Sequence, residues 1–217
     1  MVTHMKTKKI HALCLLAAFV LWTWAVCTVD VQPIGPLDSA VGFARLNGFV
    51  HRLTGVHLWL YDLTDWLSLI PFALVGGLGI LGIVQWIRRK SLLRVDRSLL
   101  ILGGFYLAVL AVYWFFEVWT VNYRPVLING LLEASYPSST TMLALCVLPT
   151  ARMQLRCRIR NPLLGRCIGW LLVCLTVLLV VGRILSGVHW FTDSIGGVLA
   201  SGGLAAGYAA VLSRDVS

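Results

Sequence analysis

Six long apolar runs, separated by polar segments, dominate the pattern of hydrophobic and polar positions along the chain. A helix that crosses a bilayer needs roughly 20 mostly apolar residues. The pattern predicts six such helices, over residues 10–29, 66–87, 98–119, 138–156, 167–185 and 194–213. The fourth is the weakest of them, because Pro149 and Arg152 fall late in it. We therefore expect an all-α fold, a polytopic membrane helical bundle that forms a single membrane-embedded domain over residues 1–217.

The first apolar run follows a short basic segment, KTKK, as the apolar part of a secretory signal peptide would. The run is long for a signal peptide, however, and no convincing small-residue cleavage site follows it. We interpret it as a retained membrane anchor.

The segment between the first two predicted spans, residues 30–65, mixes apolar and polar positions at helical spacing. Its aromatic residues Trp59 and Tyr61, with Trp66 just beyond, suit the headgroup region of a bilayer. We expect short interfacial helices here, lying on the membrane surface.

Composition agrees with a membrane protein. The chain is 59% hydrophobic and only 12% charged, and its mean hydropathy is +0.84, whereas a soluble domain carries about 25% charged residues. Six cysteines lie mostly inside apolar runs and none forms a CxxC pair. They are typical of small buried apolar residues rather than of disulfides or metal ligands.

The net charge of +9 could indicate nucleic-acid binding, but the placement of the basic residues favours a topology signal instead. Cytoplasmic segments of membrane proteins are enriched in lysine and arginine. We therefore predict that both termini are cytoplasmic, in a multi-pass protein of the plasma (inner) membrane that binds no nucleic acid. Of the 18 basic residues, those on the predicted cytoplasmic side are Lys6, Lys8, Lys9, Arg88, Arg89, Lys90, Arg94, Arg97, Arg152, Arg156, Arg158, Arg160, Arg166 and Arg214.

The remaining four basic residues, with seven of the nine acidic ones, gather on the opposite, outer side, where topology does not account for them. Such charges are better candidates for function. The basic ones are Arg45, Arg52, Arg124 and Arg183. The acidic ones are Asp30, Asp38, Asp62, Asp65, Glu117, Glu133 and Asp193.

A cluster of Arg183, His189 and Asp193 joins the fifth and sixth predicted spans. On a helix, His189 and Asp193 would share a face, so that the carboxylate could accept from one imidazole nitrogen and leave the other as a base or nucleophile. A guanidinium such as that of Arg183 binds phosphate bidentately. Alternatively, the arginine extends to the membrane surface and the histidine caps a helix. The combination of all three residues favours function.

Two further candidates lie in the segment before the fourth span. Arg124 precedes Pro125, which stiffens the backbone beside it, although the arginine could equally contact lipid headgroups. Ser138 or Ser139 is a natural N-cap for the fourth helix. A helix N-terminus also suits phosphate, so the serines can serve both roles.

These pieces together resemble the three motifs of the type 2 phosphatidic acid phosphatase superfamily, K-x6-R-P, P-S-G-H and S-R-x5-H-x3-D. The resemblance covers the third to sixth spans, and its third motif is the most specific. The matching positions here are Arg124-Pro125, Pro137-Ser138-Ser139, Arg183, His189 and Asp193.

The resemblance implies a helical bundle whose site lies near the membrane surface and uses no metal or cofactor. In that family the third-motif histidine attacks phosphorus and becomes a phosphohistidine, which here would be His189, oriented by Asp193. The groups implied to hold the phosphoryl oxygens are Arg124, Arg183, Ser138 and Ser139.

Two positions depart from the family pattern. Glu117 stands where the first motif has lysine, and Thr140 stands where the second motif has the histidine that protonates the leaving group. Glu117 could instead pair with the arginines. Candidates to replace the missing acid are Glu117, Glu133, His51 and His57.

The missing acid affects the expected substrate. Loss of a general acid costs on the order of 10²–10⁴ in rate, but a lipid phosphate leaves readily because its own later pKa is only about 6. We therefore expect a lipid phosphatase-like protein that prefers a polyprenyl diphosphate to a simple monophosphate ester. It would act at the outer face through a phosphohistidine. Two alternatives stay open, a non-catalytic phospholipid-binding or transport protein and a lipid phosphotransferase.

The sixth predicted span is rich in small residues, which permit close helix packing. Packing within one bundle is favoured over a dimer interface, and a homo-oligomer stays open as an alternative. These residues are Gly196, Gly197, Gly202, Gly203 and Gly207.

Overall fold

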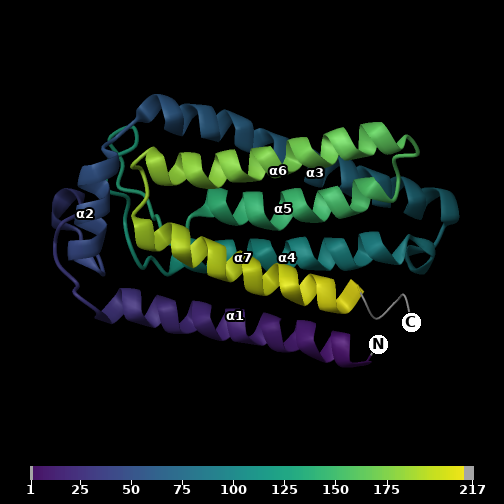
Figure 1. Cartoon of the computed structure of the whole chain (residues 1–217), viewed down its shortest axis with the longest axis horizontal. Coiled ribbons are helices and arrows are strands. Elements are labelled where there is room, and N and C mark those ends of the chain that lie inside the picture. The colour runs from purple at the N-terminus through teal and green to yellow at the C-terminus, as the bar shows by residue number, and fades with distance from the viewer. Residues whose placement is uncertain (1, 213–217) are drawn as a thin grey trace.

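The computed structural model describes residues 2–212, with side chains from residue 7 onward, and it confirms an all-α bundle. Six long helices run along the bundle and the short helix α2 lies at one end (Figure 1). Arg214 and the last residue of the predicted span 194–213 lie outside the described residues. The helices are α1 (Val2–Thr28), α2 (Ala44–Thr54), α3 (Leu58–Arg89), α4 (Arg97–Val118), α5 (Ser139–Arg156), α6 (Pro162–Leu185) and α7 (Phe191–Leu212), with 3₁₀ turns at Pro36–Asp38 and Leu92–Arg94.

Helix α5 occupies the middle of the bundle, where it packs against α3, α4, α6 and α7. Five of the described helices, α1, α3, α4, α6 and α7, are long and apolar enough to cross a membrane by length and composition. α5 is not among them, but most of its residues are buried against protein. A helix surrounded by other helices tolerates polar residues that a lipid-facing helix does not. This explains why the fourth apolar run is the weakest, and the six-span count stays a prediction.

Helix α3 begins at Leu58, so the boundary predicted at residue 66 is wrong by about two turns. Of the interfacial helices expected over residues 30–65, α2 and the Pro36–Asp38 turn are present. Helix α2 ends at Gly55, whose φ is +66°. Helix α3 then continues without a break from Leu58 past Pro71. The early start places Tyr61 and Asp65 on the same rigid helix as the apolar span.

Both ends of the described chain lie at one end of the bundle (Figure 1). The basic connections between α3 and α4 and between α5 and α6 lie at that same end, while α2 and the α6–α7 connection lie at the other. The spatial arrangement therefore agrees with the separation of charges along the sequence. Which end faces the cytoplasm stays a prediction from those charges.

The small residues of α7 allow close packing inside the bundle. A Cβ atom added at Gly203 would lie 2.7 Å from Cδ2 of Leu16 on α1, and one added at Gly196 would lie 2.6 Å from the Tyr136 ring. Both distances are too short for a side chain to fit without movement. At these two positions, glycine is required by contacts within the bundle.

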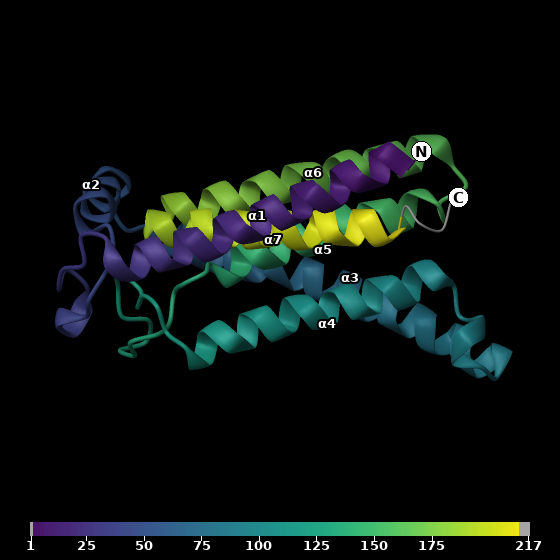
Figure 2. The ribbon, with the colours of Figure 1, turned by 90° about the horizontal axis from the view of Figure 1, so that it is seen from below.

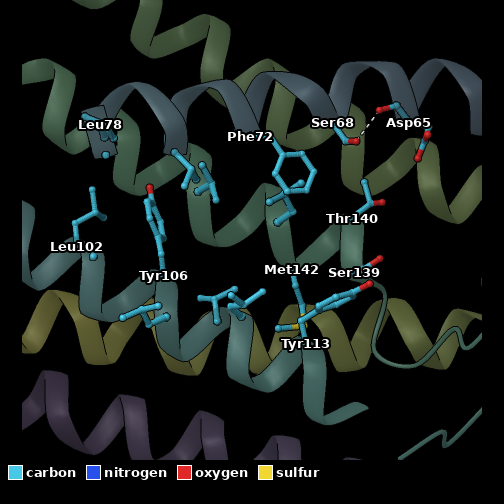
Figure 3. A pocket seen from close by; sticks show the side chains of 18 of the residues that line it. Asp65, Ser68, Phe72, Leu78, Leu102, Tyr106, Tyr113, Ser139, Thr140 and Met142 are labelled. Carbon is cyan, nitrogen blue, oxygen red and sulfur yellow. Dashed lines mark hydrogen bonds between the residues drawn. The ribbon is translucent and has the colours of Figure 1, made fainter. Parts of the chain in front are cut away.

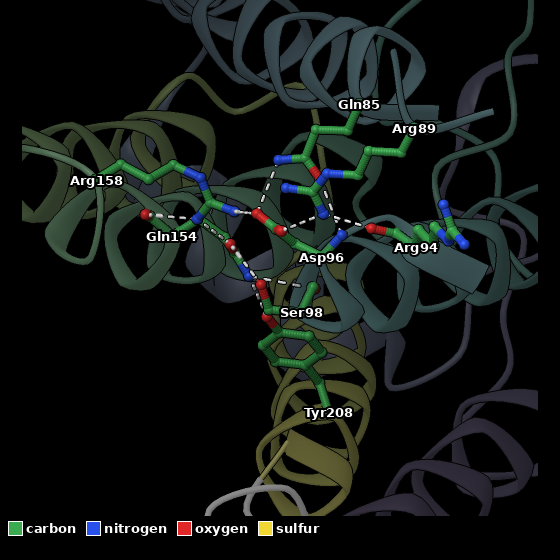
Figure 4. A network of polar contacts seen from close by, with 8 residues as sticks. All are labelled: Gln85, Arg89, Arg94, Asp96, Ser98, Gln154, Arg158 and Tyr208. Carbon is green, nitrogen blue, oxygen red and sulfur yellow. Dashed lines mark hydrogen bonds and ion pairs between the residues drawn. The ribbon is translucent and has the colours of Figure 1, made fainter. Parts of the chain in front are cut away.

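A polar network at the end that carries the termini fixes the α3–α4 turn (Figure 4). The Asp96 carboxylate accepts from Gln85 Nε2 at 2.8 Å and from Arg89 Nη1 at 3.1 Å, and it lies 3.7 Å from Arg158 Nη2 beyond α5. The Gln85 hydrogen bond and then the two arginines hold the pKa of Asp96 below its usual value. Asp96 thus links α3 to the loop that follows α5.

We expect Asp96→Asn to lower the thermal unfolding temperature of the detergent-solubilised protein at pH 7. Because the pKa of Asp96 is lowered in the folded state, its carboxylate stabilises the folded protein fully above the unfolded pKa of about 3.9. This stabilisation of the fold is lost as the pH falls through the folded-state pKa. The difference from wild type should therefore close in strongly acidic buffer. Asp38→Asn, an exposed position at the opposite end of the bundle, is the control. A difference that does not change with pH would contradict this role.

Candidate functional site

A cavity of ≈ 750 Å³ lies between α3, α4 and α5 and changes from polar to apolar along its length (Figure 3). Viewed from below, α3 and α4 cross on one side of the layer formed by α1, α5, α6 and α7 (Figure 2). One helix face shows the gradient, because Asp65, Ser68, Phe72 and Leu78 of α3 all line the cavity in that order. The other lining residues with polar side-chain atoms are Arg124, Ser139, Thr140 and Arg183, together with the tyrosines Tyr106 and Tyr113.

Arg183, in the last turn of α6, is almost wholly buried at the polar end of the cavity. Its Nε donates to Thr140 Oγ1 at 2.9 Å and its Nη2 donates to Asp65 Oδ1 at 3.0 Å. Its Cζ lies 4.6 Å from the centre of the Tyr61 ring. Its Nη1 is buried and has no hydrogen-bond partner. A fixed guanidinium therefore keeps one donor free for a ligand.

Arg124 reaches the same place from the loop between α4 and α5. Its Nε lies 3.0 Å from Glu133 Oε2, and its Cζ lies 5.8 Å from the Tyr61 ring centre. Its Nη1 is also buried without a hydrogen-bond partner. The structure thus brings Arg124 and Arg183, far apart in the sequence, around one tyrosine ring. Like charges held this close are stabilised by a bound anion.

His189 lies in the connection between α6 and α7, and its side chain is buried. Its Nδ1 lies 3.2 Å from the backbone oxygen of Ser135. Because a carbonyl oxygen only accepts hydrogen bonds, Nδ1 carries the proton and Nε2 keeps its lone pair. Nε2 is buried without a partner. Burial, followed by the charges of Arg124 and Arg183, lowers the pKa of His189 well below its usual value, so the ring is neutral.

The predicted hydrogen bond between Asp193 and His189 is not formed. Helix α7 begins only at Phe191, so His189 precedes it and does not share a helix face with Asp193. The fully buried carboxylate instead accepts from the backbone N–H of Trp190 at 3.0 Å and from Asn122 Nδ2 at 2.9 Å. Asp193 therefore holds the loop that carries His189, and the Ser135 carbonyl orients the ring.

Two asparagines that no sequence motif selects complete this support. The Nδ2 of Asn122 donates to Asp193, and its Oδ1 accepts from the backbone N–H of Gly42 at 3.4 Å. Asn47 of α2 is fully buried, donates to Thr192 Oγ1 at 2.9 Å and accepts from the Thr192 backbone N–H at 3.2 Å. It thereby pairs a backbone donor in the first turn of α7, which a helix leaves without an internal partner. The first outer segment thus fixes the start of α7.

The connection that carries His189 also packs tightly on the start of α3. The backbone N–H of His57 donates to the Ser186 oxygen at 2.9 Å. Gly187 has a φ of +68°, and a Cβ added there would lie 1.9 Å from the Gly55 oxygen. Only glycine fits both the left-handed backbone and this close approach.

The hydroxyl residues that begin α5 have distinct environments. Ser138 takes the N-cap position as predicted, but its side chain forms no capping hydrogen bond and accepts instead from Thr141 Oγ1 at 3.0 Å. Ser138 is fully buried and its backbone N–H donates to the Asp193 oxygen at 3.0 Å. Ser139 and Thr140 line the cavity. The hydroxyls that face a ligand are therefore those of Ser139 and Thr140.

The alternative that Glu117 pairs with the arginines is wrong. Glu117 is exposed on α4, and the carboxylates beside the arginines are Glu133 at Arg124 and Asp65 at Arg183. His51 packs its ring 5.4 Å from that of Trp190. The cavity lining contains none of the four residues considered as a replacement acid, which are Glu117, Glu133, His51 and His57.

Among the side chains that the structure describes, those of residues 7–212, no three of histidine, cysteine, aspartate or glutamate gather as metal ligands would. The positive charge in the cavity lining comes from Arg124 and Arg183. The site therefore offers an anion two fixed guanidinium groups beside a neutral, buried imidazole. Such an arrangement suits phosphate binding and nucleophilic attack on phosphorus.

Comparison with known proteins bears out the resemblance in the motifs. Residues 117–216 match the model of the PAP2 superfamily. The crystal structure of the first transmembrane PAP2 type phosphatidylglycerolphosphate phosphatase from Bacillus subtilis superposes with a TM-score of 0.63 at 18% identity, over 94% of this chain and 96% of that one. At this identity the likeness establishes a shared fold. The chain matches none of the curated proteins compared with it.

We expect His189 to remain neutral and protonated on Nδ1 at about pH 5.5, where an ordinary histidine is mostly charged. The lowered pKa and the Ser135 carbonyl give this result together. Nitrogen-15 NMR of histidine-labelled protein in detergent measures both properties, and His189→Ala identifies the resonances. Signals of a doubly protonated ring at that pH would contradict the geometry.

Proposed function

We propose that this chain, whose residues 117–216 match the model of the PAP2 superfamily, is a membrane lipid phosphatase with His189 as its nucleophile. One observation carries the proposal. Three buried nitrogen atoms have no hydrogen-bond partner in the protein, Nη1 of Arg124, Nη1 of Arg183 and Nε2 of His189. Both arginines line the polar end of an otherwise apolar cavity, and their charges act on the nearby His189 ring, which lies just outside the lining. Leaving a buried donor unpaired costs about 1–3 kcal/mol, more when it is charged, and a bound phosphoryl group would pair the two guanidinium donors while the Nε2 lone pair of His189 stays free to attack phosphorus.

The shape and lining of the cavity support a lipid substrate. Beyond the arginines, the lining is formed by apolar residues of α3, α4 and α5. Several of them on α3 and α4, including Phe72, Leu107 and Leu110, are also exposed on the outside of the bundle, where a bilayer would contact them. A lipid could place its phosphate between the arginines while its chains remain in apolar surroundings.

The proposed chemistry follows from the state of each group. The Nε2 lone pair of His189 attacks phosphorus, the bond to the leaving oxygen breaks, and a phosphohistidine forms. Arg124 and Arg183 stabilise the charge on the phosphoryl oxygens, which is the main requirement of phosphoryl transfer. The Ser139 and Thr140 hydroxyls can add hydrogen bonds, since both line the cavity. Water then cleaves the phosphorus–nitrogen bond and restores the imidazole.

The proposed preferred substrate is a polyprenyl diphosphate. Thr140 stands where the family has its acid histidine, and its hydroxyl accepts a hydrogen bond from Arg183. An alkoxide leaving group needs a proton, whereas a lipid phosphate leaves without one because its later pKa is only about 6. A site without an acidic imidazole therefore handles the diphosphate better than the monoester.

The proposed location of the site is the extracytoplasmic face of the plasma (inner) membrane. The α6–α7 connection, which carries His189, the last turn of α6, which carries Arg183, and the α4–α5 loop, which carries Arg124, lie at the end of the bundle opposite the basic connections (Figure 1). The positive-inside tendency assigns the basic end to the cytoplasm.

We expect purified protein in detergent to release phosphate faster from a polyprenyl diphosphate than from the matched polyprenyl monophosphate or phosphatidic acid. His189→Ala should abolish release from all three. Arg183→Lys should lower kcat by about 10²–10³, the usual cost of losing one aligned donor to the transition state. Arg52→Lys, an exposed arginine on α2, is the matched control.

Two outcomes would overturn the proposal. Wild-type protein that binds these lipids without releasing phosphate would be a lipid-binding protein, and release that survives His189→Ala would exclude the nucleophile. Equal or faster hydrolysis of the monophosphate would contradict the substrate preference alone.

A further inference from the structure

A carboxylate stands at the phosphate-binding end of the cavity, where a phosphatase has no obvious need for one. Asp65 of α3 lines the cavity, and its Oδ1 lies 3.0 Å from Nη2 of Arg183. The two partners differ in access, because the Asp65 side chain is 59% exposed and that of Arg183 only 3%. Asp65 can therefore leave the ion pair, whereas Arg183 is fixed.

Asp65 also lies where the polar and apolar parts of the cavity meet. Ser68 and Phe72 follow it on the same face of α3, and Thr140 of α5 stands across from it (Figure 3). In a lipid phosphate monoester, the leaving oxygen is the atom that joins the phosphoryl group to the apolar chain. A phosphate between the arginines with its chain in the apolar part would place that oxygen at the level of Asp65.

We propose that Asp65 donates the proton to the leaving oxygen when the substrate is a lipid monophosphate. This inference rests on the proposed phosphatase function and names the group that replaces the missing acid. Asp65 lines the cavity, whereas Glu117, Glu133, His51 and His57 do not.

The proton is supplied by the substrate. The step uses the monoester monoanion, which carries one proton and is present near neutral pH because the later pKa of a phosphate is about 6. It displaces the Asp65 carboxylate from Arg183, and its proton passes to that carboxylate while the dianion takes the guanidinium. His189 Nε2 attacks phosphorus, the phosphorus–oxygen bond breaks, and the leaving oxygen takes the proton from Asp65. In the second step Asp65 accepts a proton from the water that attacks the phosphohistidine, and the electron pair of the phosphorus–nitrogen bond returns to Nε2.

The groups that face Asp65 are consistent with this exchange. Arg183 comes from α6 and Arg124 from the loop before α5, and both hold the phosphate charge. Tyr61 lies on the same helix one turn earlier and contacts both guanidinium groups. Tyr113 comes from α4 and lines the same cavity. Tyr113 carries a phenol hydroxyl within the cavity lining, so it is included in the test.

The proposal makes the two substrate classes depend on Asp65 to different degrees. A monophosphate releases an alcohol and needs the proton, while a diphosphate releases a lipid phosphate and does not. We expect Asp65→Asn to lower kcat for a polyprenyl monophosphate at least tenfold, toward the 10²–10⁴ typical of a lost general acid. With a diphosphate of the same chain, any loss of kcat should be smaller and should reflect only the loosened Arg183, so that the ratio of monophosphate to diphosphate kcat falls severalfold or more. Asp65→Glu should restore part of the monophosphate activity.

The test is phosphate release by the full chain in detergent, with both substrates measured on the same preparation of each variant. Diphosphate hydrolysis reports correct folding of Asp65→Asn. The matched control is Asp62→Asn, the same exchange on the same helix at an exposed residue outside the cavity lining. It should leave both rates unchanged.

Three results would overturn the assignment. Asp65→Asn could lower both rates in proportion, which would make Asp65 a support for Arg183 alone, or it could change neither. A selective loss of monophosphate activity in Tyr113→Phe but not in Asp65→Asn would move the role to the tyrosine. Failure of the proposed function is recognised separately, because wild-type protein would then release phosphate from neither substrate.

Discussion

The burial of Arg183 is the constraint on which the rest of the site depends. A guanidinium near the hydrocarbon region is expensive unless its charge and donors are paired. Here Thr140 and Asp65 each take one donor, and Tyr61 offers the face of its ring. These partners fix the plane of the group and leave Nη1 without a protein partner. Pairing that is nearly complete gives the arginine a defined position and still leaves it able to bind an anion.

His189 is also fixed by its contacts and keeps one polar atom without a partner. Its ring is neutral because it is buried beside two arginines, and it is oriented because one nitrogen donates to a backbone carbonyl. The loop that carries it is held by Asp193, which caps the turn into α7, and by Asn47 and Asn122, which tie that turn to the outer segments. The long helices thus position the site, while short polar contacts at their ends set its geometry. Helix α2 contributes through Asn47, which hydrogen-bonds Thr192 and holds the start of α7 in place, in addition to any contact with the membrane surface.

The sequence predicts the helices well because a membrane span is a long, continuous signal. It places the start of α3 too late because residues 58–65 are amphipathic, and a pattern of mixed polarity does not distinguish an interfacial helix from the first turns of a span. It selects Arg124, Arg183 and His189 because their spacing matches a motif. It misassigns the partner of His189, since a spacing of four implies contact only if both residues lie on one helix, and α7 begins after His189. The pairing of Asp65 with Arg183 joins α3 to α6, and no local pattern contains that information.

The central claim is that His189 becomes covalently phosphorylated at the polar end of the cavity, and trapping that intermediate tests it most directly. Wild-type protein would be mixed with polyprenyl diphosphate labelled with phosphorus-32 on the terminal phosphate and quenched in alkali, in which phosphohistidine survives. The account predicts label on the peptide that contains His189 and none in His189→Asn. Turnover of substrate without any label on the protein, or label that persists in His189→Asn, would contradict it.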